Sequence, residues 1–209
     1  MFVSIEGIDG CGKTTQIKLL AEYLSQLGVE FTIVREPGGT SAGEEIRQML
    51  LHKDFRLCAE SELLLFMAAR AQIVREVIRP ALESGRLVIA DRFMDSSVAY
   101  QGVGRDLGQK VVEFMNSFAV GNTVPDITLY IDVPADVAMS RMRKEKKNDK
   151  IEVESLEFFE RVRKGYERLM AENHKRFVVI DGRKSEEQVH EDIRKSLSVL
   201  TEKRKPNRR

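Results

Sequence analysis

Short apolar runs alternate with longer segments of mixed apolar and polar residues along most of the chain. The short runs are rich in β-branched residues and occupy residues 2–6, 31–34, 87–91, 127–133 and 177–181. Near-continuous apolar runs of this length are typical of strands that are buried on both faces of a parallel sheet. The pattern therefore predicts five strands.

The longer segments carry apolar residues at helical spacing. After the first strand, Ile17, Leu20 and Leu24 recur every three or four residues, and Gly28 is a typical helix stop. Further helices are predicted near residues 42–52, 60–84, 106–120, 135–146, 154–173 and 186–202. In the segment 154–173, the predicted buried side consists of Leu156, Phe159, Val162, Tyr166 and Met170. Strands that alternate with helices indicate βαβ units, so the predicted fold class is α/β with a parallel sheet.

The stretch GIDGCGKTT, residues 7–15, joins the first strand to the first helix. Its spacing of Gly7, four residues, Gly12, Lys13 and Thr14 is the pattern of a phosphate-binding loop. Glycines let consecutive backbone N–H groups point at one anion, and the helix adds the positive end of its dipole. Lys13 can then reach the outer phosphates, and the Thr14 hydroxyl can ligate Mg²⁺. Because a strand precedes the stretch and an amphipathic helix follows it, we interpret it as a nucleotide phosphate site.

Composition limits the function classes and the cellular context. The 209 residues carry a formal net charge of +1, which argues against a dedicated nucleic-acid binder. The last seven residues, KRKPNRR, are mostly basic, so we predict a single domain of residues 1–202 and a disordered tail of residues 203–209. Two cysteines and three histidines suggest neither a disulfide framework nor a metal-ligand cluster. Without a membrane-length apolar run or an export leader, the expected location is the cytoplasm, with no membrane partner.

Residues 141–152, RMRKEKKNDKIE, are strongly basic and nearly free of apolar side chains. Most charge runs of this kind are solvated helix ends. Beside a phosphate site, the segment can also be a mobile lid that brings cations over a triphosphate. The residues alone leave both interpretations open.

A second anion site is indicated at the end of the third predicted strand. Asp91 and Arg92 lie there, at the edge where open α/β sheets bind ligands. Arg47 and Arg70, in predicted helices, could converge on the same crevice, and arginines beside an ATP loop suggest a phosphorylated acceptor. The chain lacks the Asn-Lys-x-Asp string with which GTP-dependent switch proteins read guanine, and it is shorter than most motor or transporter ATPases.

Together with Arg47, four strings in this order resemble thymidylate kinase of the bacterial type: REPGGT (35–40), FMAARAQ (66–72), DRFMDSSVAYQGVGR (91–105) and DKIEVESLEFFERVRKGY (149–166). The resemblance runs from about residue 3 to residue 182. It implies a three-layer P-loop kinase fold with a five-stranded parallel sheet flanked by helices, usually as a homodimer. It also implies phosphorylation of dTMP to dTDP with ATP and Mg²⁺, in dTTP synthesis for DNA replication.

The resemblance also implies roles for individual residues. The residues expected to bind ATP are Gly7, Ile8, Asp9, Gly10, Cys11, Gly12, Lys13, Thr14, Thr15, Arg141 and Arg183. The residues expected to bind dTMP are Asp9, Arg35, Pro37, Arg47, Phe66, Arg70, Arg92, Ser97, Tyr100 and Gln101. Within that set, Phe66 would stack on thymine, Arg70 would donate to its O4, and Tyr100 would exclude a ribose 2′-hydroxyl. Thr14 and Asp91 would hold Mg²⁺, and the expected catalytic residues are Lys13, Arg92, Asp9 and Lys150.

Some of these roles compete with plainer ones. Phe66 lies in the apolar string LLLFMAA, where packing alone would explain it, and Tyr100 could be a core tyrosine. Lys150 stands where this family usually has arginine, so it keeps the charge but loses the forked donor geometry. Cys11 stands at a position where this family commonly has alanine. The alternative functions are a kinase for another pyrimidine monophosphate and an ATP-binding regulator without catalysis.

Overall fold

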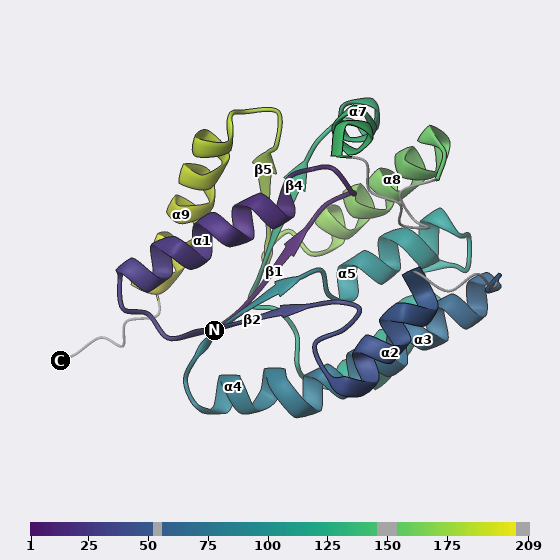
Figure 1. Ribbon diagram of the computed structural model, residues 1–209, viewed down its shortest axis with the longest axis horizontal. Helices are drawn as coiled ribbons and strands as arrows, with labels where there is room; N and C mark the ends of the chain where they lie inside the picture. Colours follow the sequence, from purple (N-terminus) through teal and green to yellow (C-terminus); the bar gives the residue numbers. More distant parts are fainter. Residues whose placement is uncertain (52–55, 146–153, 204–209) are drawn as a thin grey trace.

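A computed structural model describes residues 1–51, 56–145 and 154–203 (Figure 1). Within these residues, five parallel strands form one sheet in the order β2-β3-β1-β4-β5. The strands are β1 (Phe2–Glu6), β2 (Phe31–Arg35), β3 (Leu87–Asp91), β4 (Ile127–Asp132) and β5 (Phe177–Asp181). The five predicted strands are confirmed to within one residue at each end.

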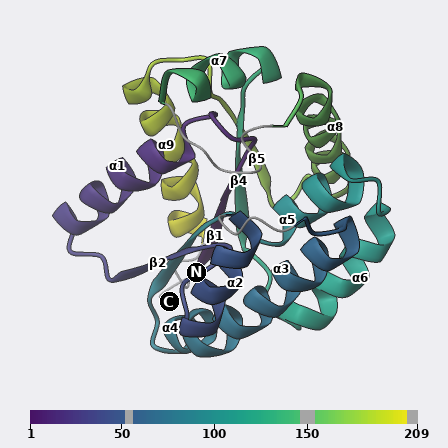
Figure 2. The same ribbon diagram turned by 45° about the vertical axis from the view of Figure 1, so that its right-hand side comes forward.

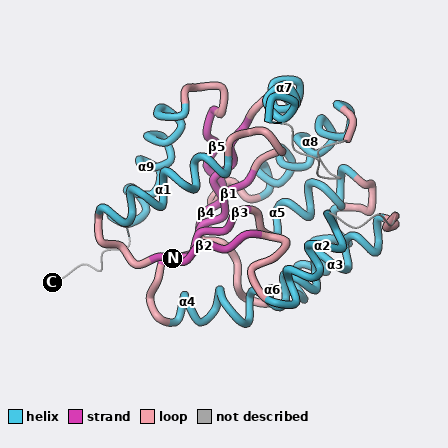
Figure 3. Tube along the Cα trace, in the orientation of Figure 1, coloured by secondary structure: helices cyan, strands magenta, loops and turns pink. Residues whose placement is uncertain are grey.

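Helices cover both faces of the sheet, so the molecule has the three predicted layers (Figure 3). In the described residues they are α1 (Lys13–Gln26), α2 (Ser41–Leu51), α3 (Ala59–Ile73), α4 (Arg79–Glu83), α5 (Met94–Ser97), α6 (Gln109–Val120), α7 (Ala135–Glu145), α8 (Leu156–Glu172) and α9 (Glu186–Lys203). Two π-helical segments, η1 (Val74–Ile78) and η2 (Val98–Gly104), continue α3 and α5. Helices α1 and α9 lie side by side on one face, and α3, α6 and α8 lie on the other (Figure 2).

Alternate residues of the central strands pack on opposite helix layers, as expected for a sheet that is buried on both faces. One buried cluster joins the strands to α1 through Val3, Ile5, Ile89, Ile17 and Leu20, and it extends to α8 as well. A second cluster joins the strands to α3 and η1 and includes Phe2, Val88, Ala90, Ile73 and Ile78. The near-continuous apolar runs in the sequence follow from this burial on two sides.

The order of the strands creates a switch point at the carboxyl edge of the sheet. Strand β1 lies between β3 and β4, so the chain passes from β1 to one side of the sheet and later returns to the other side. Open α/β sheets bind ligands outside the carboxyl ends of their strands at such a point. The glycine loop follows β1, and Asp91 ends the neighbouring strand β3. The two predicted anion sites therefore open on the same edge.

Several helix boundaries differ from the prediction. The segment predicted as one helix over 60–84 is α3, η1 and α4 in succession. Residues 94–104, for which the sequence predicted no helix, form α5 and η2. Helix α6 begins at Gln109 rather than near residue 106, because Asp106 (φ 62°) and Gly108 (φ 89°) have positive φ angles that a right-handed helix does not allow.

The buried side of α8 is also shifted from the predicted side. Leu156 is 44% exposed, although the spacing predicted that it is buried. The buried apolar residues of α8 are Phe158, Phe159, Val162, Tyr166 and Leu169. The helix therefore turns its aromatic residues toward η2, with which it makes its most extensive contact.

The predicted lid and tail lie mostly outside the described residues. Of the lid, residues 141–145 belong to α7, and residues 146–152 with Lys150 are not described. Of the tail, only Lys203 is described, as the last residue of α9.

Candidate active site

A cavity of about 1200 Å³ opens along the carboxyl edge of the sheet. Ligand pockets of about 300–1,000 Å³ are typical for a single small molecule, so this cavity has room for more than one. Most of the predicted site residues line it: Asp9, Gly10, Cys11, Gly12, Lys13, Thr14, Thr15, Arg35, Pro37, Arg47, Phe66, Arg70, Asp91, Arg92, Ser97, Tyr100, Gln101 and Arg141. Gly7, Ile8 and Arg183 are described but do not line it.

The glycine loop folds around the ammonium group of Lys13. Lys13 Nζ donates to the carbonyl oxygens of Gly7 at 2.9 Å and Ile8 at 3.0 Å. These two residues therefore support the lysine from beneath instead of facing the cavity. Gly10 has φ 78°, and a Cβ at this position would lie 2.3 Å from the carbonyl oxygen of Ala138. The loop requires glycine here for both its backbone angle and its close approach to α7.

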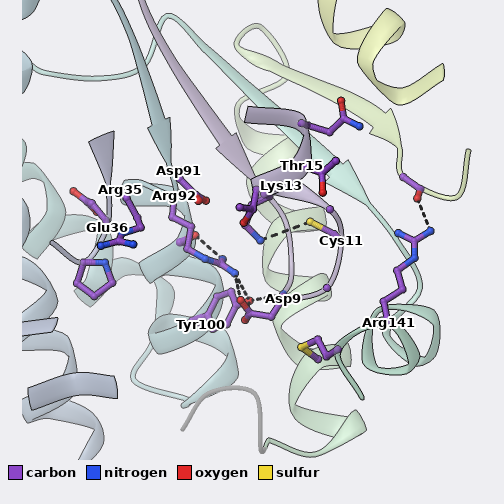
Figure 4. Close-up of a pocket in the computed structure, with 18 of the residues that line it drawn as sticks. Asp9, Cys11, Lys13, Thr15, Arg35, Glu36, Asp91, Arg92, Tyr100 and Arg141 are labelled. Atoms are coloured by element: carbon purple, nitrogen blue, oxygen red, sulfur yellow. Dashed lines mark hydrogen bonds and ion pairs between the residues drawn. The ribbon is translucent and has the colours of Figure 1, made fainter. Parts of the chain in front are cut away.

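Arg92, Asp9 and Tyr100 form one hydrogen-bonded cluster in the middle of the cavity (Figure 4). Arg92 Nη2 donates to Asp9 Oδ1 at 2.5 Å and to the Tyr100 hydroxyl at 3.2 Å, and that hydroxyl donates to Asp9 Oδ2 at 2.7 Å. Burial alone would raise the pKa of Asp9, but the positive charges of Arg92 and Lys13 outweigh it and hold this pKa below its usual value. The cluster therefore contains an ionised carboxylate paired with a fixed guanidinium.

Glu6 supports Arg92 from the end of β1, a role that the sequence analysis missed. The buried Glu6 carboxylate accepts from the Phe93 N–H at 2.8 Å, the Ser96 hydroxyl at 2.5 Å and the Tyr166 hydroxyl at 2.9 Å. Ser96 in turn accepts from Arg92 Nη1 at 3.2 Å. Arg92 has φ 68°, which is unfavourable for a residue with a side chain, so these contacts hold a strained backbone in place. A charged residue in a mostly apolar strand was the signal for this role.

Arg70 lies in the cavity wall with all five of its N–H donors engaged. Its Nε and Nη2 both donate to Glu36 Oε2. Its Nη1 donates to Ser97 Oγ at 2.9 Å and to Asn116 Oδ1 at 2.7 Å, and Nη2 also donates to the Phe93 carbonyl at 3.1 Å. Donation by Arg70 to a base would therefore need one of these bonds to exchange. Ser97 accepts from Arg70 and keeps its own hydroxyl proton as a donor at the cavity wall.

The remaining residues of the predicted acceptor site lie around this wall. Phe66 is half-buried, packs against the core and also lines the cavity, so its position is compatible with both of the roles that the sequence left open. Arg47 Nη1 donates to the carbonyl oxygen of Pro37 at 2.8 Å. The Arg35 side chain is 53% exposed and lies 3.5 Å from a Glu44 carboxylate oxygen.

The opposite end of the cavity is formed by α7 and the loop before α9. Arg141 Nη2 donates to the carbonyl oxygen of Gly182 at 3.0 Å and so joins the two segments (Figure 4). Arg183, in contrast, is exposed and pairs with Asp181 at 2.8 Å. Its neighbours Lys184 and Ser185 line the cavity instead, and the sequence analysis did not single them out.

Thr14 and Asp91 line the cavity and fit the magnesium role that was expected of them. A hydroxyl and a carboxylate are hard oxygen donors, which Mg²⁺ prefers, and Mg²⁺ in kinases takes most of its other ligands from phosphates and water. The described residues contain no group of three or more histidines, cysteines and acids that could enclose a metal ion. This donor set therefore suits an ion that arrives with a nucleotide.

Comparisons with known proteins identify the family of the chain. The sequence model of the family described as thymidylate kinase matches residues 5–193. The chain belongs to this family. It is 57% identical to a thymidylate kinase of Kosmotoga olearia, over 97% of this chain and 98% of the relative. It is 54% identical to a thymidylate kinase of Fervidobacterium nodosum, over 95% of this chain and 99% of the relative.

A solved structure supports the same assignment. The crystal structure of thymidylate kinase from Ehrlichia chaffeensis matches with a TM-score of 0.79 and 39% sequence identity, and the match covers 95% of this chain and 98% of that one. The predicted fold and enzyme class, a nucleoside monophosphate kinase, are therefore confirmed. Among the described residues, no helix has the length and apolar character that a membrane span requires.

Proposed function

We propose that the chain transfers the γ-phosphoryl group of ATP to the phosphate of dTMP, which gives ADP and dTDP in the synthesis of dTTP for DNA replication. One observation carries this proposal: a single cavity joins the glycine loop and Lys13 to a wall that contains Arg47 and Arg92. The family assignment supports the choice of nucleotides. Both cysteines are free, which supports the cytoplasm as the location.

In this proposal, ATP occupies the end of the cavity between the glycine loop and the start of α9. Residues 10–15 offer their backbone N–H groups to the phosphates, and the N-terminus of α1 adds its dipole. Lys13 exchanges its bonds to the loop carbonyls for bonds to the transferring phosphoryl group. Arg141 lies along the adenine, opposite Lys184 and Ser185.

The acceptor dTMP occupies the other end. Arg92, with Arg47 and Arg35, pairs with its phosphate, because a guanidinium can donate two parallel hydrogen bonds to phosphate oxygens. For this, Arg92 exchanges some of its bonds to protein groups for bonds to the phosphate. The thymine stacks on Phe66, and its polar edge faces Ser97, Gln101 and Arg70, with Pro37 nearby. Tyr100 lies below the deoxyribose, where a 2′-hydroxyl would be crowded.

Phosphoryl transfer depends mainly on positioning and on neutralising charge. Arg92 offsets the repulsion between the two nucleotides, and Asp9 and Glu6 keep its guanidinium in one orientation. Thr14 and Asp91 would hold Mg²⁺, which supplies positive charge between the phosphates. The role of Lys150 as a lid cation remains a prediction, since this residue lies outside the described part of the chain.

We also propose that two copies of the chain pair through α6 and the neighbouring α3. Phe114 and Phe118 of α6 are 75% and 85% exposed, and Val111, on the same side, is 53% exposed. Leu64 of α3, a helix in contact with α6, is 57% exposed. Exposed large apolar side chains on one helix side, with a further one on a neighbouring helix, often mark a protein contact. A two-fold symmetric dimer would bury the same face on both copies.

The substitution Lys13→Ala tests the placement of ATP. We expect turnover to fall below a few per cent of the unmodified level, since the lysine stabilises charge on the transferring group. We expect dTMP binding, measured by calorimetry, to change little, because within the described part of the chain the Lys13 ammonium group hydrogen-bonds to the glycine loop alone. Lys18→Ala, on the exposed side of α1, is the matched control and should keep full turnover. Substantial turnover in Lys13→Ala would contradict the placement.

A further inference from the structure

The side-chain amide of Gln101 lies between the cavity and a carboxylate behind it. Gln101 is 2% exposed and lines the cavity from η2. Its Nε2 donates to Glu62 Oε1 at 2.9 Å. Glu62 belongs to α3, one turn before Phe66, and is not part of the cavity lining. The NH₂ end of the Gln101 amide is therefore held by Glu62, which a ligand in the cavity does not contact.

Glu62 forms an ion pair with Arg105. Arg105 Nε and Nη2 each donate to one oxygen of the Glu62 carboxylate, both at 3.4 Å. Arg105 is itself fixed, since its Nη1 lies 2.6 Å from Glu154 Oε1 and its guanidinium carbon lies 4.6 Å above the ring of Phe158. A carboxylate in such an ion pair can only accept hydrogen bonds.

The orientation of the amide follows from this chemistry. Because Glu62 can only accept, the Gln101 NH₂ group must face it, and the Gln101 carbonyl oxygen must face away from it. Among the described residues, this oxygen has no hydrogen-bond partner, although Gln101 is almost fully buried. It is therefore an acceptor in the cavity wall, available to a ligand that can donate.

We propose that Glu62 is a positioning residue that sets Gln101 as an acceptor and thereby selects bases with an N3–H donor. The inference rests on the proposed function, which places a pyrimidine edge beside Gln101 and Ser97. Thymine and uracil carry a hydrogen on N3, which Gln101 can accept. Cytosine carries a lone pair on N3, which would face the oxygen of Gln101 without a hydrogen between them. Glu62 acts through Gln101 and touches no substrate.

The test is the variant Glu62→Gln. A glutamine at position 62 can donate as well as accept, so the amide of Gln101 is free to turn over and present its NH₂ group to the cavity. We expect kcat/KM for dTMP and for dUMP to fall by the same factor, about tenfold, which corresponds to one neutral hydrogen bond. The kcat/KM for dCMP should stay level or rise, and the KM for ATP should not change.

Two further variants make the result decisive. Glu172→Gln is the matched control, because Glu172 also accepts from a glutamine amide, that of Gln109 at 2.6 Å, but on the exposed surface. It should leave all three nucleotides unaffected. In a Gln101→Met background the amide is absent, so Glu62→Gln should no longer change the ratio of dTMP to dCMP. Circular dichroism establishes that each variant is folded.

The possible outcomes separate the inference from the proposed function. An equal loss for dTMP, dUMP and dCMP in Glu62→Gln, or no loss at all, would overturn the inference. The inference would also be overturned if Glu62→Gln changed the ratio of dTMP to dCMP kcat/KM as much in the Gln101→Met background as in the unmodified chain. Failure of the unmodified chain to phosphorylate dTMP would instead overturn the proposed function. Calorimetry with dTMP and dCMP in the absence of ATP gives the same comparison for binding alone.

Discussion

Arg92 is the residue at which the two halves of the cavity meet. Its Nη1 donates to the carbonyl oxygen of Gly7 in the glycine loop at 3.0 Å, and its Nη2 donates to Asp9 on the cavity side of the same loop. Its guanidinium carbon also lies 4.9 Å from the centre of the Tyr100 ring. These contacts fix the guanidinium between the glycine loop and η2, where a phosphate can replace some of them.

Arg92→Lys separates the charge of this side chain from its shape. Lysine keeps the positive charge but cannot contact Gly7, Asp9 and Tyr100 together, since it lacks the planar fork. We expect kcat/KM for dTMP to fall about 100-fold, which corresponds to the loss of roughly one charge-assisted hydrogen bond. Arg86→Lys is the control, because Arg86 is a half-exposed partner of Glu30. Steady-state kinetics with both variants measure the effect, and near-normal kcat/KM in Arg92→Lys would contradict the assigned role.

The residues that the sequence analysis missed are mainly carboxylates that act through other side chains. The glycine loop and Arg92 could be predicted, because their patterns lie within a few consecutive residues. Glu6, Glu36 and Glu62 contact partners that are 87, 34 and 39 positions away in the chain. No local pattern encodes such contacts, since they depend on how the strands and helices are arranged. In addition, the sequence alone does not show whether an aspartate or glutamate is buried or exposed.

At the scale of elements, the strands were predictable and the segment from Met94 to Gly104 was not. The strands are buried on both faces, so they appear in the sequence as near-continuous apolar runs. Helix α5 and η2 are instead buried among other elements, so their polar residues, such as Ser96 and Gln101, lie inside the molecule. Their sequence therefore lacks the amphipathic spacing that identifies a surface helix.

The close packing of α8 on η2 gives a prediction at this scale. A Cβ at Gly165 of α8 would lie 2.9 Å from Ala99 Cα and 3.2 Å from Val103 Cβ. We expect Gly165→Ala to destabilise the protein by about 1–3 kcal/mol, although alanine favours helices by about 1 kcal/mol over glycine. The KM for dTMP should also rise, because η2 carries Tyr100 and Gln101.

Urea unfolding and steady-state kinetics measure these two effects. Lys164→Ala, one residue earlier on the exposed side of α8, is the control and should stay within about 0.5 kcal/mol of the unmodified chain. A more stable Gly165→Ala with an unchanged KM would show that η2 does not depend on this contact.

At the scale of the whole molecule, the exposed side of α6 predicts the state of assembly. We expect the unmodified chain to sediment as a dimer and Phe118→Asp to sediment as a monomer, since a charge at an apolar interface must be desolvated. Leu27→Asp, which changes a 58% exposed leucine far from α6, should leave the dimer intact. A monomeric unmodified chain at micromolar concentration would contradict the proposed pairing.

The most direct measurement of the central claim is the rate of ADP release with a panel of nucleoside monophosphates. Ser97 offers a donor to a base O4, Arg70 can donate there in exchange for one of its present bonds, and Gln101 offers an acceptor to N3–H. Thymine and uracil match both, whereas cytosine matches neither and would leave polar groups unpaired in a partly desolvated wall. The 5-methyl group adds only about 10–200-fold discrimination. We therefore expect kcat/KM to fall from dTMP to dUMP and to be far lower for dCMP. Phosphorylation of dCMP as efficient as that of dUMP would contradict the account.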